Sequence, residues 1–340
     1  MNLSALATSA AERMRIPDPL LRAGIASRVA DLARMLAKAK TTDAAFAAWM
    51  PDNPVALHTD AANAQHYELP AEFFAAVLGT HRKYSSCLYQ TGTETLAQAE
   101  HAALHATCAM AALEDGQHIL ELGCGWGSLT LFMAARLPAS RIVAVSNSHS
   151  QRLHITAAAA AQGLTNVKVI TADMNAFAPG QEFDRIISVE MFEHMANWRA
   201  LLTRLRGWLA PDGRVFLHVF SHAGTAYRFD HEHGADWIAR YFFTGGIMPS
   251  HRLIHQFADL FAVASERRWP GTHYQRTALH WLANFDANRA VIDPLLRAAY
   301  GTEAALWARR WRLFFLAVAG LFGHADGEVW GVSQYLLTAV

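Results

Sequence analysis

The chain has 340 residues, of which 52% are hydrophobic and 17% are charged, a composition that excludes a disordered chain. This length suits about two domains, or one large domain with insertions. Lysine plus arginine equals aspartate plus glutamate, at 29 each, so the sequence predicts no nucleic-acid partner and fits a neutral or apolar small ligand better.

The opening segment, MNLSALATSAAERM, has no basic start and too short an apolar run for a signal peptide. The longest apolar run, residues 313–322, is about half the length that spans a bilayer. The three cysteines, Cys87, Cys108 and Cys124, form no close pair, which argues against a disulfide framework or a zinc site. We therefore expect a soluble cytoplasmic protein without a metal ion.

Residues 17–40 predict an amphipathic helix with a basic polar face. The favoured interpretation is a helix packed on its own domain, and contact with a membrane surface is the alternative. Residues 51–60 then form a loop, so we expect a helical N-terminal region over residues 1–80. The apolar positions of the helix at the required spacing are Leu21, Ile25, Leu32 and Leu36.

From residue 117 onward, short apolar strands alternate with helices. Such alternation makes a parallel sheet with right-handed crossovers, so the predicted fold class is α/β. The predicted helices span residues 128–137, 150–164 and 198–213, the last stopped by Pro-Asp-Gly. The predicted strands span residues 118–122, 141–146, 166–173, 183–190 and 214–220.

After His222 the pattern is less regular. Residues 251–261 predict a helix, and two late strands are expected to complete a seven-stranded sheet, with the extra helices over its carboxyl edge. Residues 81–340 would then form one domain with cap insertions near 223–250 and 277–325. The two late strands are predicted over residues 262–270 and 328–340.

Three glycines join the first strand to its helix in the stretch HILELGCGWGSLTLFMAARL, residues 118–137. Glu121 precedes a G-x-G-x-G pattern, whereas the dinucleotide fingerprint is G-x-G-x-x-G. A carboxylate is unfavourable beside phosphates, so the bend suits a positively charged, phosphate-free ligand. A tight turn without a ligand is the alternative. The glycines are Gly123, Gly125 and Gly127.

This E-x-G-x-G-x-G pattern resembles the first motif of class I S-adenosylmethionine methyltransferases. The resemblance implies a Rossmann-like sheet, S-adenosyl-L-methionine as cofactor and S-adenosyl-L-homocysteine as product. It also implies that the ribose and adenine are bound after the second and third strands, where Met174 either packs on the ring or belongs to the core. The residues concerned are Ser146, Asn147, Gln151, Asp173 and Met174.

Further strings resemble one superfamily. HRKYSSCLYQ, residues 81–90, resembles a segment of the cyclopropane fatty acid synthases in which Tyr84 and Ser85 contact the cofactor, and SVEMFEHM and GTHYQRT fit the same superfamily. The resemblance narrows to plant coclaurine and related benzylisoquinoline N-methyltransferases. It runs from about residue 75 to the C-terminus and is carried by DWIARYFFTGGIMPS, WRLFFLAVAGLFG and EVWGVSQYL.

Glu190, Glu193 and His194 are the predicted catalytic residues. The synthases usually have glycine at position 190, whereas the amine N-methyltransferases have glutamate. If a helix begins at the end of the fourth strand, the three side chains share one face. An alkylamine with a pKa near 10 arrives protonated, so we expect Glu190 and His194 to act as a general-base pair. Acids that complement a helix dipole are the alternative interpretation.

Aromatic side chains suit a cationic substrate, and we expect two or three of six candidates to line its pocket. The resemblance to cyclopropane synthases implies another occupant, a bicarbonate held by Cys87, Glu193, His218 and Tyr274, under a lipid-modifying alternative. The aromatic candidates are Trp237, Tyr241, Phe242, Phe243, Trp281 and Trp330.

The leading hypothesis is therefore methyl transfer to the nitrogen of a small-molecule amine. Modification of unsaturated acyl chains is the first alternative, and a non-catalytic cofactor-binding protein is the second. Besides the amine substrate, the sequence is compatible with a homodimer and with peripheral membrane contact through the helix at residues 17–40.

Overall fold

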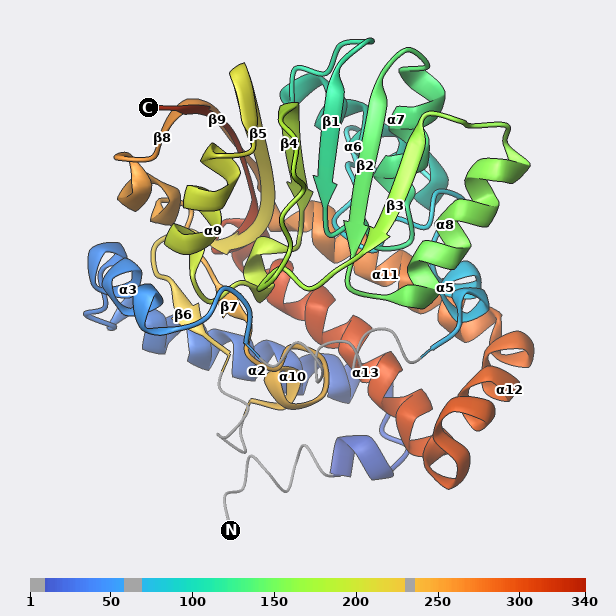
Figure 1. Cartoon of the computed structure of the whole chain (residues 1–340). Coiled ribbons are helices and arrows are strands. Elements are labelled where there is room, and N and C mark those ends of the chain that lie inside the picture. The colour runs from blue at the N-terminus through green and yellow to red at the C-terminus, as the bar shows by residue number, and fades with distance from the viewer. Residues whose placement is uncertain (1–9, 58–68, 230–235) are drawn as a thin grey trace.

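The computed structural model describes residues 10–57, 69–229 and 236–340 (Figure 1). Residues 1–9, on which much of the signal-peptide prediction depended, lie outside the described residues. The end of the predicted loop at 51–60 and the middle of the predicted cap at 223–250 lie outside them too.

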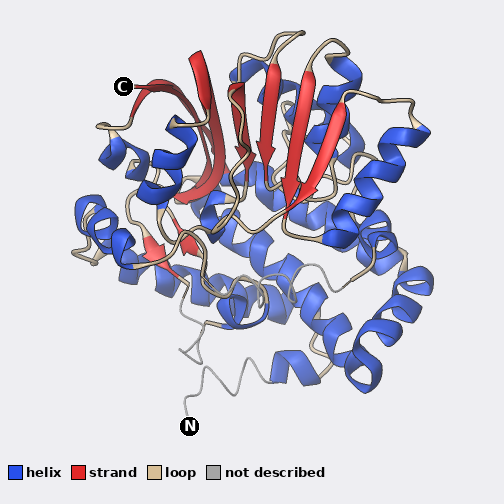
Figure 2. Cartoon of the chain, viewed as in Figure 1, coloured by secondary structure: helices blue, strands red, loops and turns tan. Residues whose placement is uncertain are grey.

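The centre of the molecule is a seven-stranded sheet, whose strands are red in Figure 2. Their order is β3-β2-β1-β4-β5-β9-β8, as the labels in Figure 1 allow the reader to follow. The first five strands are parallel, and β9 runs antiparallel between β5 and β8. The predicted seven-stranded α/β fold is thus confirmed. The strands are β1 (His118–Leu122), β2 (Arg141–Ser146), β3 (Val167–Thr171), β4 (Phe183–Val189), β5 (Leu209–His222), β8 (Phe261–Pro270) and β9 (Trp330–Ala339).

Helices cover both faces of the parallel strands, which is why those strands are continuous apolar runs rather than alternating patterns. In β1, Ile119 packs with the cluster beneath α6 and α7, whereas Leu120 and Leu122 pack with the cluster beneath α9. The covering helices are α6 (Leu96–Met110), α7 (Ser128–Arg136), α8 (His149–Ala161) and α9 (Trp198–Arg206).

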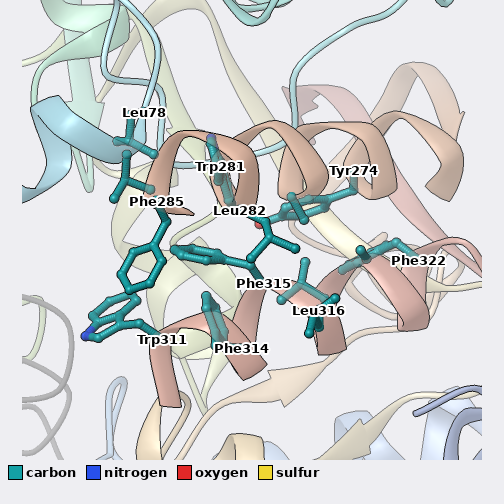
Figure 3. Close-up of a cluster of buried hydrophobic side chains, with 14 of the residues drawn as sticks. Leu78, Tyr274, Trp281, Leu282, Phe285, Trp311, Phe314, Phe315, Leu316 and Phe322 are labelled. Atoms are coloured by element: carbon teal, nitrogen blue, oxygen red, sulfur yellow. The ribbon is translucent and has the colours of Figure 1, made fainter. Parts of the chain in front are cut away.

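A helical layer lies across the carboxyl edge of the sheet, below the arrowheads in Figure 1. Its centre is an aromatic cluster between α11 and α13, where Trp281 and Phe285 face Trp311 and Phe315 (Figure 3). The layer and its surroundings contain α2 (Asp18–Ala37), α3 (Asp43–Trp49), α5 (Ala71–Val77), β6 (Tyr227–Arg228), α10 (Trp237–Tyr241), β7 (Ile247–Met248), α11 (Gly271–Ala287), α12 (Arg289–Tyr300) and α13 (Ala304–Phe322).

Helix α2 packs along α13, which supports the interpretation of a helix folded onto its own domain. Val29 and Leu36 are buried, and Arg312 of α13 donates to both Asp18 of α2 and Asp286 of α11. Within the described ranges, we find no helix whose length and apolarity would allow it to cross a membrane.

Two predicted elements are wrong in extent because long-range strand pairing overrides the local pattern. The helix expected to reach residue 213 ends at Arg206, since Leu209 already pairs with Phe183 of β4. The helix expected over residues 251–261 is only a 3-10 turn at Leu253–Phe257, and Phe261 pairs with Ala339 of β9.

Candidate active site

The three glycines between β1 and α7 have different reasons to be glycine. All have positive φ, at +77° for Gly123, +52° for Gly125 and +82° for Gly127. A Cβ at Gly123 would lie 2.6 Å from the side chain of Met191, and one at Gly127 would lie 2.6 Å from Ile155. A Cβ at Gly125 would meet no atom within 4 Å. Only Gly125 therefore leaves its space to a ligand.

Two adjoining cavities meet at this bend, and both are lined by Gly123, Gly125, Gln151 and His194. The first contains about 720 Å³ of empty space and the second about 950 Å³. The first cavity is further lined by Ala56, Leu57, Val145, Ser146, Asn147, Ala172, Asp173, Met174, Met191, Met195 and Thr244.

The first cavity brings together all five residues predicted to bind the ribose and adenine. The Ser146 hydroxyl donates to Gln151 Oε1 at 2.6 Å, whereas the Gln151 amide nitrogen has no partner among the described residues. One oxygen of Asp173 accepts from Asn175 N at 2.7 Å. Ala56 and Leu57 also line this cavity, although no sequence motif marks them. They are placed there because the Asn175 side chain accepts from the N–H of Ala56 and donates to its C=O.

Glu121 lines the second cavity from the end of β1. Its carboxyl group accepts a hydrogen bond from Thr130 Oγ1 at 2.5 Å. Burial raises the pKa of Glu121 to about 8, although the Thr130 hydrogen bond acts in the opposite direction. A cation brought into the cavity would favour the carboxylate form and would be bound by it.

Three buried polar atoms around the bend have no hydrogen-bond partner in the part of the chain that the structure describes. They are the Trp126 indole nitrogen, the Ser128 hydroxyl and the Gln151 amide nitrogen. Buried polar groups without partners are rare in folded proteins, so their position beside the open face of Gly125 indicates a polar ligand.

The segment before α6 forms another wall of the second cavity. The buried carboxylate of Glu100 accepts from the backbone N–H of Gly79, His81 and Lys83 and so fixes this segment. Tyr84 and Ser85, the two residues of this segment predicted to contact the cofactor, line the cavity.

Cys87 does not line either cavity. It is buried behind the same segment, with its backbone N–H donating to Thr277. Burial raises the pKa of the Cys87 thiol to about 12, so it remains neutral.

Glu190 ends β4 in a left-handed conformation, with φ at +49°, and no α-helix begins there. The expectation that Glu190, Glu193 and His194 share one helix face is therefore wrong, because only a 3-10 turn follows at Phe192–His194. The turn instead aims the Glu190 carboxylate into a ring of three groups, Ser86 N at 2.9 Å, His218 Nε2 at 3.3 Å and Tyr274 OH at 2.7 Å.

The groups that surround the Glu190 carboxylate keep it ionised. Burial alone would raise the pKa of Glu190, but the hydrogen bond from His218, the positive charge of Lys83 and the Ser86 N–H lower it below its usual value. The amide nitrogen of Gln334 donates to His218 Nδ1, so the other ring nitrogen carries the proton and donates it to Glu190.

Glu193 and His194 have different surroundings. Glu193 is fully buried, accepts from Phe220 N at 2.6 Å and lines neither cavity. Burial and the negative charge of Glu190 raise the pKa of Glu193 well above its usual value, so it is protonated. His194 lines both cavities and stacks on Phe243, with ring centroids 4.3 Å apart. The histidine that contacts Glu190 is His218.

Of the six aromatic candidates, Phe243 and Trp281 line the second cavity, and Tyr274 lines it as well. The other four line neither cavity, because they hold the helical layer together. Trp237 donates to Glu12, Tyr241 lies under the Arg310 guanidinium, Phe242 stacks on Phe314, and Trp330 donates to Tyr227. The second cavity is further lined by Arg82, Lys83, Leu104, Thr107, Cys124, Trp126, Ser128, Leu129, Val189, Phe220 and Phe314.

The sheet order and the acid-tipped glycine bend define the class I methyltransferase fold. The family model for mycolic acid cyclopropane synthetase matches residues 57–332, and the chain belongs to this family. Its enzyme class is that of the S-adenosylmethionine-dependent methyltransferases, as predicted.

Relatives within the family differ in the reactions that their names describe. (S)-coclaurine N-methyltransferase of Thalictrum flavum subsp. glaucum is 35% identical over 287 residues, which cover 83% of this chain and 80% of that protein. Cyclopropane-fatty-acyl-phospholipid synthase of Escherichia coli is 28% identical over 274 residues, which cover 79% of this chain and 66% of that protein. The crystal structure of coclaurine N-methyltransferase bound to N-methylheliamine and S-adenosylhomocysteine matches with a TM-score of 0.91 at 31% identity, covering 98% of this chain and 99% of that one.

Cofactor binding is expected to depend on pH through Glu121. Since its pKa is about 8 in the free protein and falls when a cation binds, binding releases a proton below pH 8. The affinity for S-adenosylmethionine should therefore rise between pH 6 and pH 8, by at most about tenfold per unit. Calorimetry in buffers of different ionisation enthalpy counts the released protons.

The matched control is Glu121→Gln, which keeps the shape of the side chain but does not titrate. The α-amino group of the cofactor itself titrates near pH 8 and contributes equally in both proteins. An unchanged pH profile in Glu121→Gln would contradict the role given to this carboxyl group.

Proposed function

We propose that this chain transfers a methyl group from S-adenosylmethionine to the nitrogen of a small-molecule amine. The observation that carries the proposal is the position of the Glu190 carboxylate, which is ionised and lines the cavity beside the glycine bend. A fixed negative charge in an otherwise aromatic cavity suits a substrate that is a cation, or becomes one during the reaction.

The same observation argues against the lipid-modifying alternative. Under that alternative, Cys87, Glu193, His218 and Tyr274 would hold a bicarbonate ion. His218 and Tyr274 instead contact the carboxylate of Glu190, which is part of the chain. Cys87 is buried behind the cavity, and Glu193 is a protonated acid outside it. A diffusible bicarbonate therefore finds its hydrogen-bonding groups already occupied.

The cofactor supplies an electrophilic methyl group on a sulfonium. The chain must bring a neutral amine nitrogen into line with it and stabilise the positive charge that grows on the nitrogen during transfer. Glu190 does the second, because its carboxylate stays negative at neutral pH. Its lowered pKa also makes it a weak base, so its main role is charge stabilisation rather than removal of the amine proton.

His194 is the second catalytic residue that we propose. It lies where the two cavities meet, and its ring is held by stacking on Phe243. A neutral imidazole accepts a proton through its unprotonated ring nitrogen, and this position lets His194 take the proton that an incoming ammonium must lose. Glu190 and His194 then act on the same nitrogen without contacting each other.

The proposal is tested by a turnover screen of the purified protein. S-adenosylmethionine is supplied with cyclic and benzylic secondary amines, and in parallel with vesicles of unsaturated phospholipid, while S-adenosylhomocysteine release and product masses are measured. We expect amines that gain one methylene unit in mass. A gain of that mass on the acyl chains, with no amine methylated, would overturn the proposal in favour of lipid modification.

A further inference from the structure

Lys83 places a buried ammonium group at the second cavity. Only 3% of the residue is exposed, and its neighbours along the chain, Tyr84 and Ser85, line the same cavity. We propose that Lys83, together with the hydroxyl group of Ser85, binds the carboxylate of the amino-acid end of S-adenosylmethionine. The proposal rests on the cofactor class and is independent of the methyl acceptor.

The ammonium of Lys83 lacks a direct ionic partner. Its Nζ donates to Ser85 Oγ at 2.5 Å and to the backbone oxygen of Ser86 at 2.6 Å. An ammonium has three N–H groups, so one remains for a further acceptor. In the described part of the chain, no carboxylate oxygen lies within 4.0 Å of this nitrogen.

The two carboxylates whose pKa values the charge of Lys83 lowers already accept hydrogen bonds from other donors. Glu100 accepts three backbone N–H groups, and Glu190 is held by Ser86, His218 and Tyr274. A buried ammonium is stable when an anion joins it and costly when none does. The missing anion is therefore expected from the ligand that fills the cavity.

Ser85 extends the same binding site. A lysine ammonium has no lone pair, so the Ser85 oxygen must accept from it, and the hydroxyl proton is left to point elsewhere. Since Ser85 lines the cavity, that proton and the free N–H of Lys83 together offer two donors to one carboxylate.

The positive charges of the ligand also have a partner in the same cavity. The amino-acid end of the cofactor carries a carboxylate, an ammonium and the nearby sulfonium. The carboxyl group of Glu121, at the end of β1, is the counter-charge for the positive groups of the ligand, and the ammonium of Lys83 is the counter-charge for its carboxylate. Arg82 is the other cation along this wall, but its guanidinium nitrogen already contacts the His154 ring at 2.8 Å.

The test compares two ligands that differ only in the carboxylate. Binding of S-adenosylhomocysteine and of its decarboxylated analogue is measured by calorimetry with the wild-type protein and Lys83→Met, without any methyl acceptor. Loss of one charge-assisted hydrogen bond predicts about 10- to 100-fold weaker binding of S-adenosylhomocysteine to Lys83→Met. Binding of the decarboxylated analogue should change by less than about threefold.

Arg82→Met is the matched control, because it also replaces a cation of this wall with an unbranched apolar side chain. It is expected to affect both ligands by the same factor. Equal losses of both ligands in Lys83→Met would show that the lysine only supports the fold, and selective loss in Arg82→Met would assign the carboxylate to Arg82. Either result overturns the proposal, and so does a wild-type protein that binds both ligands equally. Failure of the amine screen leaves this comparison unaffected.

Should Lys83→Met not fold, as judged by its thermal transition, Lys83→Arg provides the second variant. It keeps the charge and is expected to retain the preference for S-adenosylhomocysteine over the decarboxylated analogue. Equal affinity of a folded Lys83→Arg protein for the two ligands would overturn the proposal.

Discussion

Replacing Glu190 with glutamine is expected to lower kcat for an amine substrate by about 100- to 1,000-fold. The amide keeps the size of the side chain but removes the negative charge that stabilises the developing cation. The affinity for S-adenosylhomocysteine should change by less than about threefold, because that product lacks the transferred methyl group and the sulfonium charge. Steady-state kinetics and calorimetry on the same preparation measure the two effects separately.

Glu190→Gly provides a sharper version of this experiment. It empties the ring of groups formed by Ser86, His218 and Tyr274 while leaving those groups in place. Glycine also accepts the positive φ of this position. We expect formate or bicarbonate to restore part of the lost activity, with saturation at millimolar concentrations.

The control for rescue is Glu190→Gln, in which the ring remains filled and added formate should have no effect. If neither anion restores Glu190→Gly, and cofactor affinity falls as much as kcat, then Glu190 only holds the segment 84–86 against β4. That outcome would contradict the electrostatic role.

The geometry of Glu190 was beyond sequence reasoning for a physical reason. The spacing of Glu190, Glu193 and His194 fits a helix face, but the backbone turns left-handed at Glu190. Its three partners come from segments separated by 28 to 104 residues, and no local pattern encodes such contacts. Glu190 still became a candidate from the sequence, because the resemblance concerns the residue type at that position and not its surroundings.

The fold was easier to predict from the sequence, because the patterns that indicate it are local. Buried parallel strands appear as apolar runs, and glycine with an acid marks the bend after β1, so the seven strands could be predicted. The residues expected to bind the ribose and adenine do line one cavity, because they follow neighbouring strands of the same sheet. Element ends were less predictable. The pairing of Leu209 with Phe183 and of Phe261 with Ala339 converted predicted helix into strand. Such pairing depends on residues distant in the chain.

For the aromatic residues too, the sequence shows which residues are present but not which of them line a cavity. Trp237, Tyr241, Phe242 and Trp330 were reasonable candidates for a cationic pocket, yet they pack within the helical layer. Composition reveals that a chain is rich in rings but not which rings face a cavity. Lys83 could have been recognised as a candidate from the sequence, because it is a charged residue immediately before the predicted cofactor residues Tyr84 and Ser85.

Alanine at Gly125 and alanine at Gly127 are expected to have opposite consequences. At Gly125 the added Cβ meets no protein atom, so unfolding free energy should fall only by the cost of the left-handed backbone, about 1–2 kcal/mol. The same Cβ enters the space where both cavities meet, and we expect cofactor affinity to fall by at least about 30-fold, a loss of about 2 kcal/mol. Calorimetry and chemical denaturation measure the two quantities.

At Gly127 the added Cβ lies 2.6 Å from Ile155, so backbone strain and overpacking should together lower the unfolding free energy by about 2–4 kcal/mol. The residue lines neither cavity, so the folded fraction should bind the cofactor nearly as well as the wild type. Combining Gly127→Ala with Ile155→Ala removes the overlap, and the two changes should couple favourably by about 1–2 kcal/mol. Strict additivity, or a larger binding loss at Gly127 than at Gly125, would refute the claim that the missing side chain leaves room for a ligand at Gly125 and room for Ile155 at Gly127.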